Sequence, residues 1–240
     1  MDMHQQPLRR LLPGFLAGAA TLALIGCEME SETELYLDDL VTVAEEGESL
    51  NTPTQIAMEM ASVQQCQDNR EKLESILGRY LPDFRAVECA QDQFQAVLRA
   101  EASVPIQAGY EASDMDAVFG LGTSTGELDD GRTAYQSAFL LNRDQLKALQ
   151  ADIQSQFHQE VDLAGSDLMV RLNNDRRGEW EVWGQYIYMD GTAHQFGKAR
   201  LNRRNRVQVK LSDVGRDVLL RSGSASLIAA TRAQDSSSDN

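Results

Sequence analysis

Apolar and polar side chains alternate along several stretches of the chain, with the period of a strand that has one buried face. The longest of these stretches runs from residue 94 to residue 106. Shorter extended segments are predicted at 34–43, 117–123, 133–141, 168–172, 180–189, 194–201 and 206–211. Asp190 and Gly191 separate two of them and are a strong signal for a hairpin turn. The pattern therefore predicts a sheet whose late strands run antiparallel.

Two stretches instead carry apolar residues at helical spacing. The first helix is predicted to begin at Asn51 or Thr52, either of which can cap it, with Pro53 in its first turn and Pro82 at its end. Its buried stripe comprises Ile56, Met60, Val63, Leu73, Leu77 and Tyr80. The second helix is predicted to begin at Asn142, another capping residue. Its inner face comprises Leu146, Leu149, Ile153 and Phe157.

The order of these elements predicts an α+β fold with a mainly antiparallel sheet and two principal helices. A strand, a helix and several strands occur twice, which suggests two similar halves, 34–125 and 133–215, within one domain spanning 34–228. The polar residues at 229–240 are expected to form a disordered tail.

The first 26 residues have the layout of an export signal. Arg9 and Arg10 precede an apolar stretch at 11–25. About 15 residues suit a signal-peptide core, because a membrane-spanning helix needs roughly 20. The sequence LIGC at 24–27 resembles the lipobox of bacterial lipoproteins, which implies cleavage before Cys27 and acylation of its sulfur and usually of its new amino group. An ordinary cleaved signal and an uncleaved anchor are the alternatives.

Acylation would make residues 27–33 a short tether between the domain and a lipid membrane. Burial of each methylene contributes about 0.8 kcal/mol, so two or three chains give a stable attachment. In Gram-negative lipoproteins an aspartate after the cysteine favours the inner membrane, and Glu28 occupies that position here. The resemblance therefore implies the cell envelope, with the outer membrane as the expected location.

Three cysteines would leave an odd thiol in an exported protein. If Cys27 carries lipid, Cys66 and Cys89 are an even pair in an oxidising compartment, where disulfides persist. Their bridge would close a loop of about 22 residues and contribute on the order of 3 kcal/mol. Two separate buried thiols are the alternative, and we predict the disulfide.

Acidic residues dominate the first two-thirds of the predicted mature chain. Residues 27–165 carry 27 acidic and 8 basic side chains, whereas residues 166–240 carry 9 acidic and 12 basic ones. Such an acidic surface repels nucleic acid, so no nucleic-acid partner is expected.

Five short stretches together resemble one group of proteins. They read CEMESETELYLDDL, TPTQIAMEM, ESILGRYLPDF shortly before a cysteine, RAEASVPI and LNNDRRGE. They are similar to a group of small proteobacterial lipoproteins assigned to a domain of unknown function. The resemblance supports the lipoprotein interpretation and implies no activity.

Familiar catalytic signatures are absent from the sequence, including H-E-x-x-H, G-x-S-x-G, paired CxxC and the P-loop lysine motif. The predicted mature chain has two histidines, His158 at the end of the second helix and His194 beside the hairpin turn. Both positions suit structural roles. A calcium ion would require the fold to gather Asp114, Asp116, Asp129 and Asp130. We therefore expect no enzyme activity, no cofactor and no metal site.

The aromatic segment at 180–189 is the best candidate for a binding surface. Alternation would place Trp180, Val182, Tyr186 and Tyr188 on one face, and Trp183, Ile187 and Met189 on the other. A basic segment nearby contains Lys198, Arg200, Arg203, Arg204, Arg206 and Lys210. Aromatic faces suit a glycan or a protein strand, and a basic patch suits an anionic partner such as lipid headgroups or lipopolysaccharide. A buried strand and a solvated turn are the alternative interpretations.

We therefore expect a membrane-anchored envelope lipoprotein whose domain serves non-enzymatic interaction or scaffolding, with envelope proteins or glycan as partners. The alternatives are an envelope lipoprotein that binds a glycan, a lipid or a metal, and an envelope hydrolase of unfamiliar type.

Overall fold

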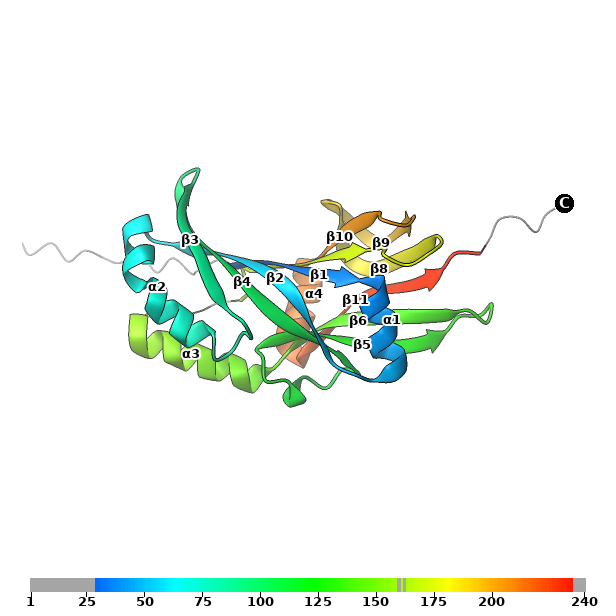
Figure 1. Ribbon diagram of the computed structural model, residues 1–240, viewed down its shortest axis with the longest axis horizontal. Helices are drawn as coiled ribbons and strands as arrows, with labels where there is room; N and C mark the ends of the chain where they lie inside the picture. The colour runs from blue at the N-terminus through cyan, green and yellow to red at the C-terminus, as the bar shows by residue number, and fades with distance from the viewer. Residues whose placement is uncertain (1–28, 159–160, 162, 235–240) are drawn as a thin grey trace, which may run out of the picture.

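The computed structural model describes residues 29–158, 161 and 163–234, so Cys27 and the predicted export signal lie outside the described residues (Figure 1). Within this part of the chain there are eleven strands, four α-helices and one short 3-10 helix. The strands are β1 Met29–Tyr36, β2 Leu50–Met60, β3 Arg85–Asp92, β4 Gln95–Ala108, β5 Phe119–Glu127, β6 Thr133–Leu141, β7 Asp167–Asn173, β8 Trp180–Met189, β9 Thr192–Leu201, β10 Arg206–Leu211 and β11 Ser224–Arg232. The helices are α1 Leu37–Glu46, α2 Val63–Leu77, α3 Arg143–Phe157 and α4 Asp213–Ser222, and the 3-10 helix spans Ala112–Asp114.

Nine of the described strands form a closed barrel. Their order is β10-β7-β1-β2-β4-β5-β6-β11-β8, and a second pairing of β8 with β10 completes the ring. The remaining two strands lie outside it, since β3 pairs with β4 and β9 pairs with β8. Among the described pairings, β1–β7 and β4–β5 are parallel and the others are antiparallel.

The predicted fold class, a sheet with two principal helices arranged as two similar halves, is wrong. The sheet closes on itself, and four α-helices accompany it in the described residues. β1 pairs with β7 and β6 pairs with β11, so strands from residues 34–125 and from residues beyond 133 share one sheet. Ring closure depends on pairings between distant segments, and local periodicity carries no signal for them.

The helix predicted from residue 51 to residue 80 begins as a strand. Thr52, Thr54 and Ile56 are buried while Asn51, Pro53 and Gln55 are exposed, which is the two-residue period of β2. The missing N–H of Pro53 is tolerated just beyond the last β1–β2 pair, Thr33–Thr54. The helix α2 starts later, where the Ser62 side chain accepts a hydrogen bond from the N–H of Gln65.

The first strand also differs from its predicted span of 34–43. β1 ends at Tyr36 and α1 follows at once, because Leu37, Leu40 and Val41 recur at helical spacing and are buried. The helix ends at Gly47, which adopts a left-handed conformation with φ +76°. α1 packs against β1, β4, β5 and β6.

Several local predictions are confirmed. Asn142 caps α3 by accepting hydrogen bonds from the N–H groups of Asp144 and Gln145. The predicted strands at 180–189 and 206–211 coincide with β8 and β10. Asp190 and Gly191 join β8 to β9 with φ angles of +47° and +78°, as a tight hairpin turn requires.

The C-terminal segment has more regular structure than the sequence pattern predicts. α4 and β11 were not predicted, and residues 229–232 of the expected tail form the end of β11. Leu227 and Ala230 of this strand are buried between β6 and β8. β11 is therefore an integral strand of the barrel.

The helices lie at different places around the barrel. α2 and α3 pack against each other near one end, beside the projecting β3–β4 hairpin, whereas α1 lies at the other end (Figure 1). α4 packs on β11 and β6. In the described part of the chain no helix is long and apolar enough to cross a membrane.

The predicted disulfide is present and joins Cys66 of α2 to Cys89 of β3, with their Cα atoms 5.8 Å apart. Cys66 is fully buried, and Arg70 one turn later donates to the carbonyl oxygen of Ala86 on β3. The bridge and this hydrogen bond hold α2 against the β3–β4 hairpin.

Replacing both bridged cysteines, Cys66→Ser/Cys89→Ser, should lower the free energy of unfolding by about 3 kcal/mol, because the unfolded chain regains the freedom of the closed loop. Denaturant unfolding of the full chain measures this change. Reduction should destabilise the native protein by a similar amount and leave the double variant unaffected. Equal stability of native and variant chains would contradict the structural role of the bridge.

Candidate functional site

The predicted aromatic face of β8 is interrupted by a change of strand partner. Residues 180–183 pair with β11, and residues 187–189 pair with β10. Between them Tyr186 has a φ of +52°, and a Cβ on Gly184 would lie 2.5 Å from the carbonyl oxygen of Leu227. The strand therefore bends here, and its side chains change face.

This bend makes the predicted grouping of the aromatic residues wrong. Trp180 is buried on the same side as Ile187, whereas Tyr186 is 49% exposed. Trp183 and Tyr188 are half-buried. Trp180 and Tyr186, which were expected on one face, are thus separated, and Trp180 belongs to a different site.

The predicted basic patch is also divided. Arg200 forms ion pairs with Glu179 and Glu181. Arg204 and Arg206 lie beside a shallow hollow near the β9–β10 turn. Lys198 pairs with Glu181, and Lys210 pairs with Asp167 while lying 4.9 Å from the ring centroid of Tyr188. Of this patch, only Arg203 lines the larger cleft described next.

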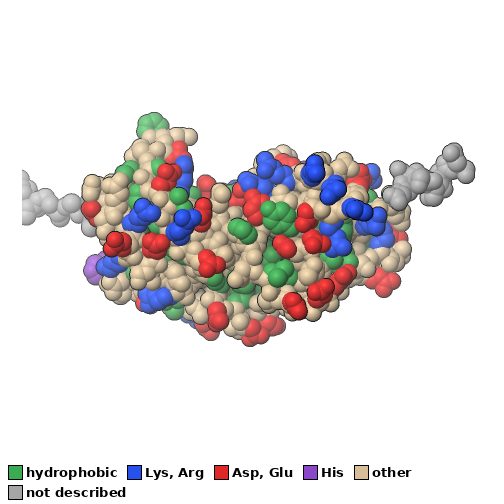
Figure 2. All heavy atoms as spheres, viewed as in Figure 1, with side chains coloured by type: hydrophobic (Ala, Val, Ile, Leu, Met, Phe, Trp, Pro, Cys, Tyr) green, Lys and Arg blue, Asp and Glu red, His purple; other side chains and the backbone are tan. Residues whose placement is uncertain are grey.

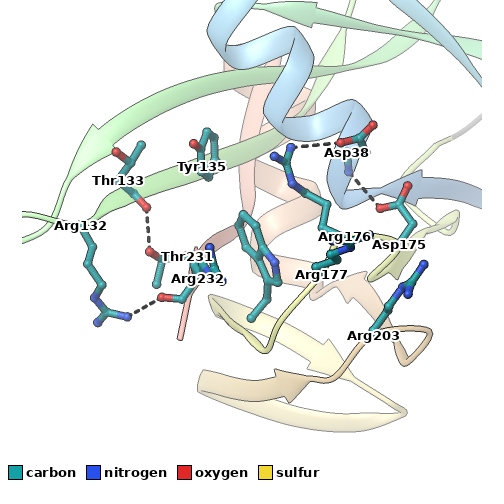
Figure 3. Close-up of a pocket in the computed structure, with 11 residues that line it drawn as sticks. Asp38, Arg132, Thr133, Tyr135, Asp175, Arg176, Arg177, Arg203, Thr231 and Arg232 are labelled. Carbon is teal, nitrogen blue, oxygen red and sulfur yellow. Dashed lines mark hydrogen bonds and ion pairs between the residues drawn. The ribbon is translucent and has the colours of Figure 1, made fainter. Parts of the chain in front are cut away.

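An open cleft of about 660 Å³ lies at the end of the barrel where α1 begins (Figure 3). Five separate parts of the chain surround it: the start of α1, the β5–β6 connection with β6, the β7–β8 connection with the start of β8, the β9–β10 turn and the end of β11. Its lining, called the arginine cleft below, comprises Asp38, Arg132, Thr133, Tyr135, Asp175, Arg176, Arg177, Trp180, Arg203, Thr231 and Arg232.

Trp180 is the most deeply buried large side chain of the arginine cleft, with 5% of its surface exposed. The ring centroid of Tyr135 lies 5.9 Å from that of the indole, and the guanidinium of Arg176 lies 5.9 Å from the indole centroid. The indole N–H has no hydrogen-bond partner among the described residues. A buried donor without an acceptor is uncommon in folded proteins and calls for an explanation.

Two of the five arginines are held by carboxylates. Arg176 pairs with Asp38 at 3.1 Å, and the backbone N–H of Asp38 donates to Asp175 at 3.1 Å. Arg132 donates to Asp130 at 2.7 Å and lies 3.5 Å from Glu181. These two arginines are therefore locally neutralised.

The pKa shifts agree with this pairing. Hydrogen bonds from the backbone and side chain of Arg132 lower the pKa of Asp130, and the bond to Asp130 raises the pKa of Arg132. Burial alone would raise the pKa of Glu181, but Lys198, Arg200 and Arg132 together lower it. These carboxylates stay ionised.

The other three arginines, Arg177, Arg203 and Arg232, have side chains without a hydrogen bond or ion pair to any described residue. All three are exposed. Five arginines and two aspartates give the lining three net positive charges, in a chain whose net charge is −15. Basic side chains gather over the same end of the molecule, around β8, β9 and β10 (Figure 2). The arginine cleft therefore attracts anions.

The histidines and the acidic residues considered for chemistry lie elsewhere. His158 caps the C-terminus of α3 with a φ of +55°. His194 lies on β9 and pairs with Ile187 of β8. Asp114 and Asp116 precede β5 whereas Asp129 and Asp130 follow it, so the strand keeps the two pairs apart. Within the described residues no group of three or more His, Cys, Asp or Glu could hold a metal ion.

A second, apolar cavity of about 70 Å³ lies near the opposite end of the barrel. Met29 at the start of β1 and Met60 at the end of β2 line it together with residues of α2 and α3. Met29 therefore lies at the α2–α3 end of the domain.

Sequence reasoning found two residues of the arginine cleft, Trp180 and Arg203, and missed the others. The strongest available signal was the pair Arg176 and Arg177 in the stretch LNNDRRGE. Arg132 and Arg232 are isolated basic residues in their own segments, and only the fold brings them together.

The domain is thus a closed barrel with a cluster of arginines at one rim. One family model matches the chain over this whole domain. The chain belongs to the family described as domain of unknown function DUF7424, which matches residues 29–234. No curated protein matches the sequence.

Tyr135 gives a pH-dependent test of the geometry of the cleft. Burial and its hydrogen bond to the carboxylate of Glu45 at 2.5 Å raise the pKa of Tyr135 to about 12. Because the folded pKa lies above the ordinary value of 10, this stabilisation is complete below pH 10 and is lost as the pH rises through 12.

Ultraviolet absorbance of phenolate should therefore show Tyr135 titrating late in the native chain, together with Tyr80, whose pKa is also raised by burial and by a hydrogen bond to Asp152. The late titration should lose one tyrosine in Tyr135→Phe and stay complete in Tyr110→Phe, which alters a more exposed tyrosine. If Tyr135 ionises together with the exposed tyrosines, its contact with Glu45 is not formed.

Proposed function

We propose that the protein is a lipid-anchored, non-enzymatic binding domain of a bacterial cell envelope, and that the arginine cleft holds an anionic ligand. The observation that carries this proposal is the presence of three unpaired arginines in one cleft of an otherwise acidic chain. Opposite charge focused in a concave site raises the local concentration of a ligand and speeds its association.

The groups that face the cleft are suited to holding a ligand. Arginine stays charged at all physiological pH values, and its planar fork matches the oxygens of carboxylates and phosphates. A volume of about 660 Å³ falls in the range of small-molecule sites. Envelope glycans and proteins that carry acidic groups are the expected partners, and the acidic body disfavours nucleic acid.

The anchoring part of the proposal rests on the lipobox at residues 24–27. β1 starts at Met29, two residues after Cys27, so an acylated Cys27 would hold the domain close to its membrane. Glu28 favours the outer membrane.

Intact mass and membrane fractionation test the anchor. The native chain should begin at an acylated Cys27 and remain with the membranes, whereas Cys27→Ser should appear in the soluble fraction. An unmodified, soluble native chain would contradict the anchoring.

Thermal unfolding of the full Cys27→Ser chain with citrate, sulfate or phosphate at low salt tests the cleft. At least one anion should raise the midpoint by several degrees, because a ligand at 100 times its Kd stabilises the folded state by about 2.7 kcal/mol. The variant Arg177→Gln/Arg203→Gln should lose this shift.

The matched control, Arg204→Gln/Arg206→Gln, removes the same charge from the neighbouring surface and should keep the shift. The absence of any anion effect would contradict the proposal. Equal shifts in all three proteins would also contradict it, because they would indicate general screening of charge.

A further inference from the structure

We propose that the ligand of the arginine cleft is a multiply charged phosphate, either a phosphate monoester or a diphosphate, which reaches the cleft from the side of the domain that faces away from its anchor. This inference rests on the proposed function and adds the chemical class of the ligand and its direction of approach.

Charge gives the first argument. The charged side chains of the lining that lack a partner are all arginines, since Asp38 and Asp175 are already engaged within the described structure. A carboxylate would neutralise one of the three unpaired charges. A phosphate monoester carries a charge of about −1.5 to −2 at pH 7 and three acceptor oxygens, and so satisfies more of them.

The origin of the donors gives the second argument. Arg177 comes from the β7–β8 connection, Arg203 from the β9–β10 turn and Arg232 from the end of β11. Three donors from separate segments match the three acceptor oxygens of a phosphate monoester better than the two of a carboxylate, and Arg is a preferred phosphate ligand.

The position of the cleft gives the direction of approach. Met29 lies beside α2 and α3, whereas Asp38, two residues after the end of β1, lines the arginine cleft. β1 is eight residues long, so its two ends are roughly 23 Å apart. β1 leads from the α2–α3 end of the domain toward α1 at the opposite end (Figure 1). A chain anchored two residues before Met29 would therefore carry its cleft at the far end, away from the headgroups of its own leaflet.

Calorimetric titration of the full Cys27→Ser chain with pyrophosphate, glycerol 3-phosphate and succinate tests the ligand class. Both phosphates should bind, and succinate should bind at least about tenfold more weakly. Arg177→Gln/Arg203→Gln should weaken phosphate binding by at least about tenfold, because each change removes a charge-assisted hydrogen bond. Arg204→Gln/Arg206→Gln should leave it unchanged.

A second variant, Arg232→Gln, tests the phosphate site if the double variant Arg177→Gln/Arg203→Gln does not fold. It alters the third unpaired arginine alone and should weaken both phosphates without changing the circular dichroism spectrum. Full phosphate affinity in a folded Arg232→Gln chain would overturn the assignment of all three arginines to one phosphate site.

The acylated native chain in vesicles distinguishes free phosphate from lipid headgroups. In phosphatidylcholine vesicles, pyrophosphate should bind as it does to the soluble chain. Added phosphatidylglycerol should not change this, because the headgroup potential falls off within about 10 Å and the cleft lies farther away. Loss of pyrophosphate binding on its addition would overturn the direction of approach and would identify the headgroup as the ligand.

The outcomes separate this inference from the proposed function. If citrate binds at the cleft and neither phosphate does, the assignment of a phosphate ligand is overturned. The proposed function, an anion-binding domain, would remain. If the native chain binds phosphate but its Cys27 is found without acyl chains, the ligand class is supported. The anchor and the direction of approach are then both overturned. The absence of all anion binding would overturn both proposals.

Discussion

The parallel pairing of β1 with β7 is the contact on which the rest of the structure depends. It joins strands that are more than 130 residues apart in the chain, with seven residues of each in register. Arg171 of β7 pairs with Glu32 and with Glu34 of β1, at 2.7 Å for Glu34. On the inner face Leu35, Val170 and Leu172 are fully buried. A slip of one residue would exchange these two faces, so the register is strongly specified.

Closure of the ring follows from this pairing. β7 also pairs with β10, and β10 can then reach β8, whose first half belongs to the β11 side of the sheet. The bend at Tyr186 allows one strand to serve both neighbours, and Gly184 leaves room for the carbonyl oxygen of Leu227. The irregular backbone within β8 is thus the means by which the barrel closes, and it also turns Trp180 inward and Tyr186 outward.

The arginine cleft is a consequence of the same closure. The connections β5–β6, β7–β8 and β9–β10 meet at one rim because the strands that they join all reach it, and the end of β11 lies there too. Aspartates and glutamates hold Arg132 and Arg176, and Arg176 in turn covers Trp180. This arrangement leaves the other arginines of the rim unpaired, so the cleft keeps a positive charge on an acidic protein. Paired strands behind the exposed arginine side chains are a sound basis for a binding site, since a preorganised site spends less of its binding energy on ordering.

The sequence by itself determined the features that neighbouring residues control. It placed β8 and β10, the cap of α3 at Asn142, the turn at Asp190 and Gly191, and the pairing of Cys66 with Cys89, because periodicity, capping, turn chemistry and cysteine number are local or countable properties. The tertiary structure alone decided the closed barrel, the strand β2 in place of a helix, and the meeting of Arg132, Arg177 and Arg232 in one cleft. These features depend on which distant strands pair, and the free energy of that pairing comes from contacts across the whole chain that no local window contains.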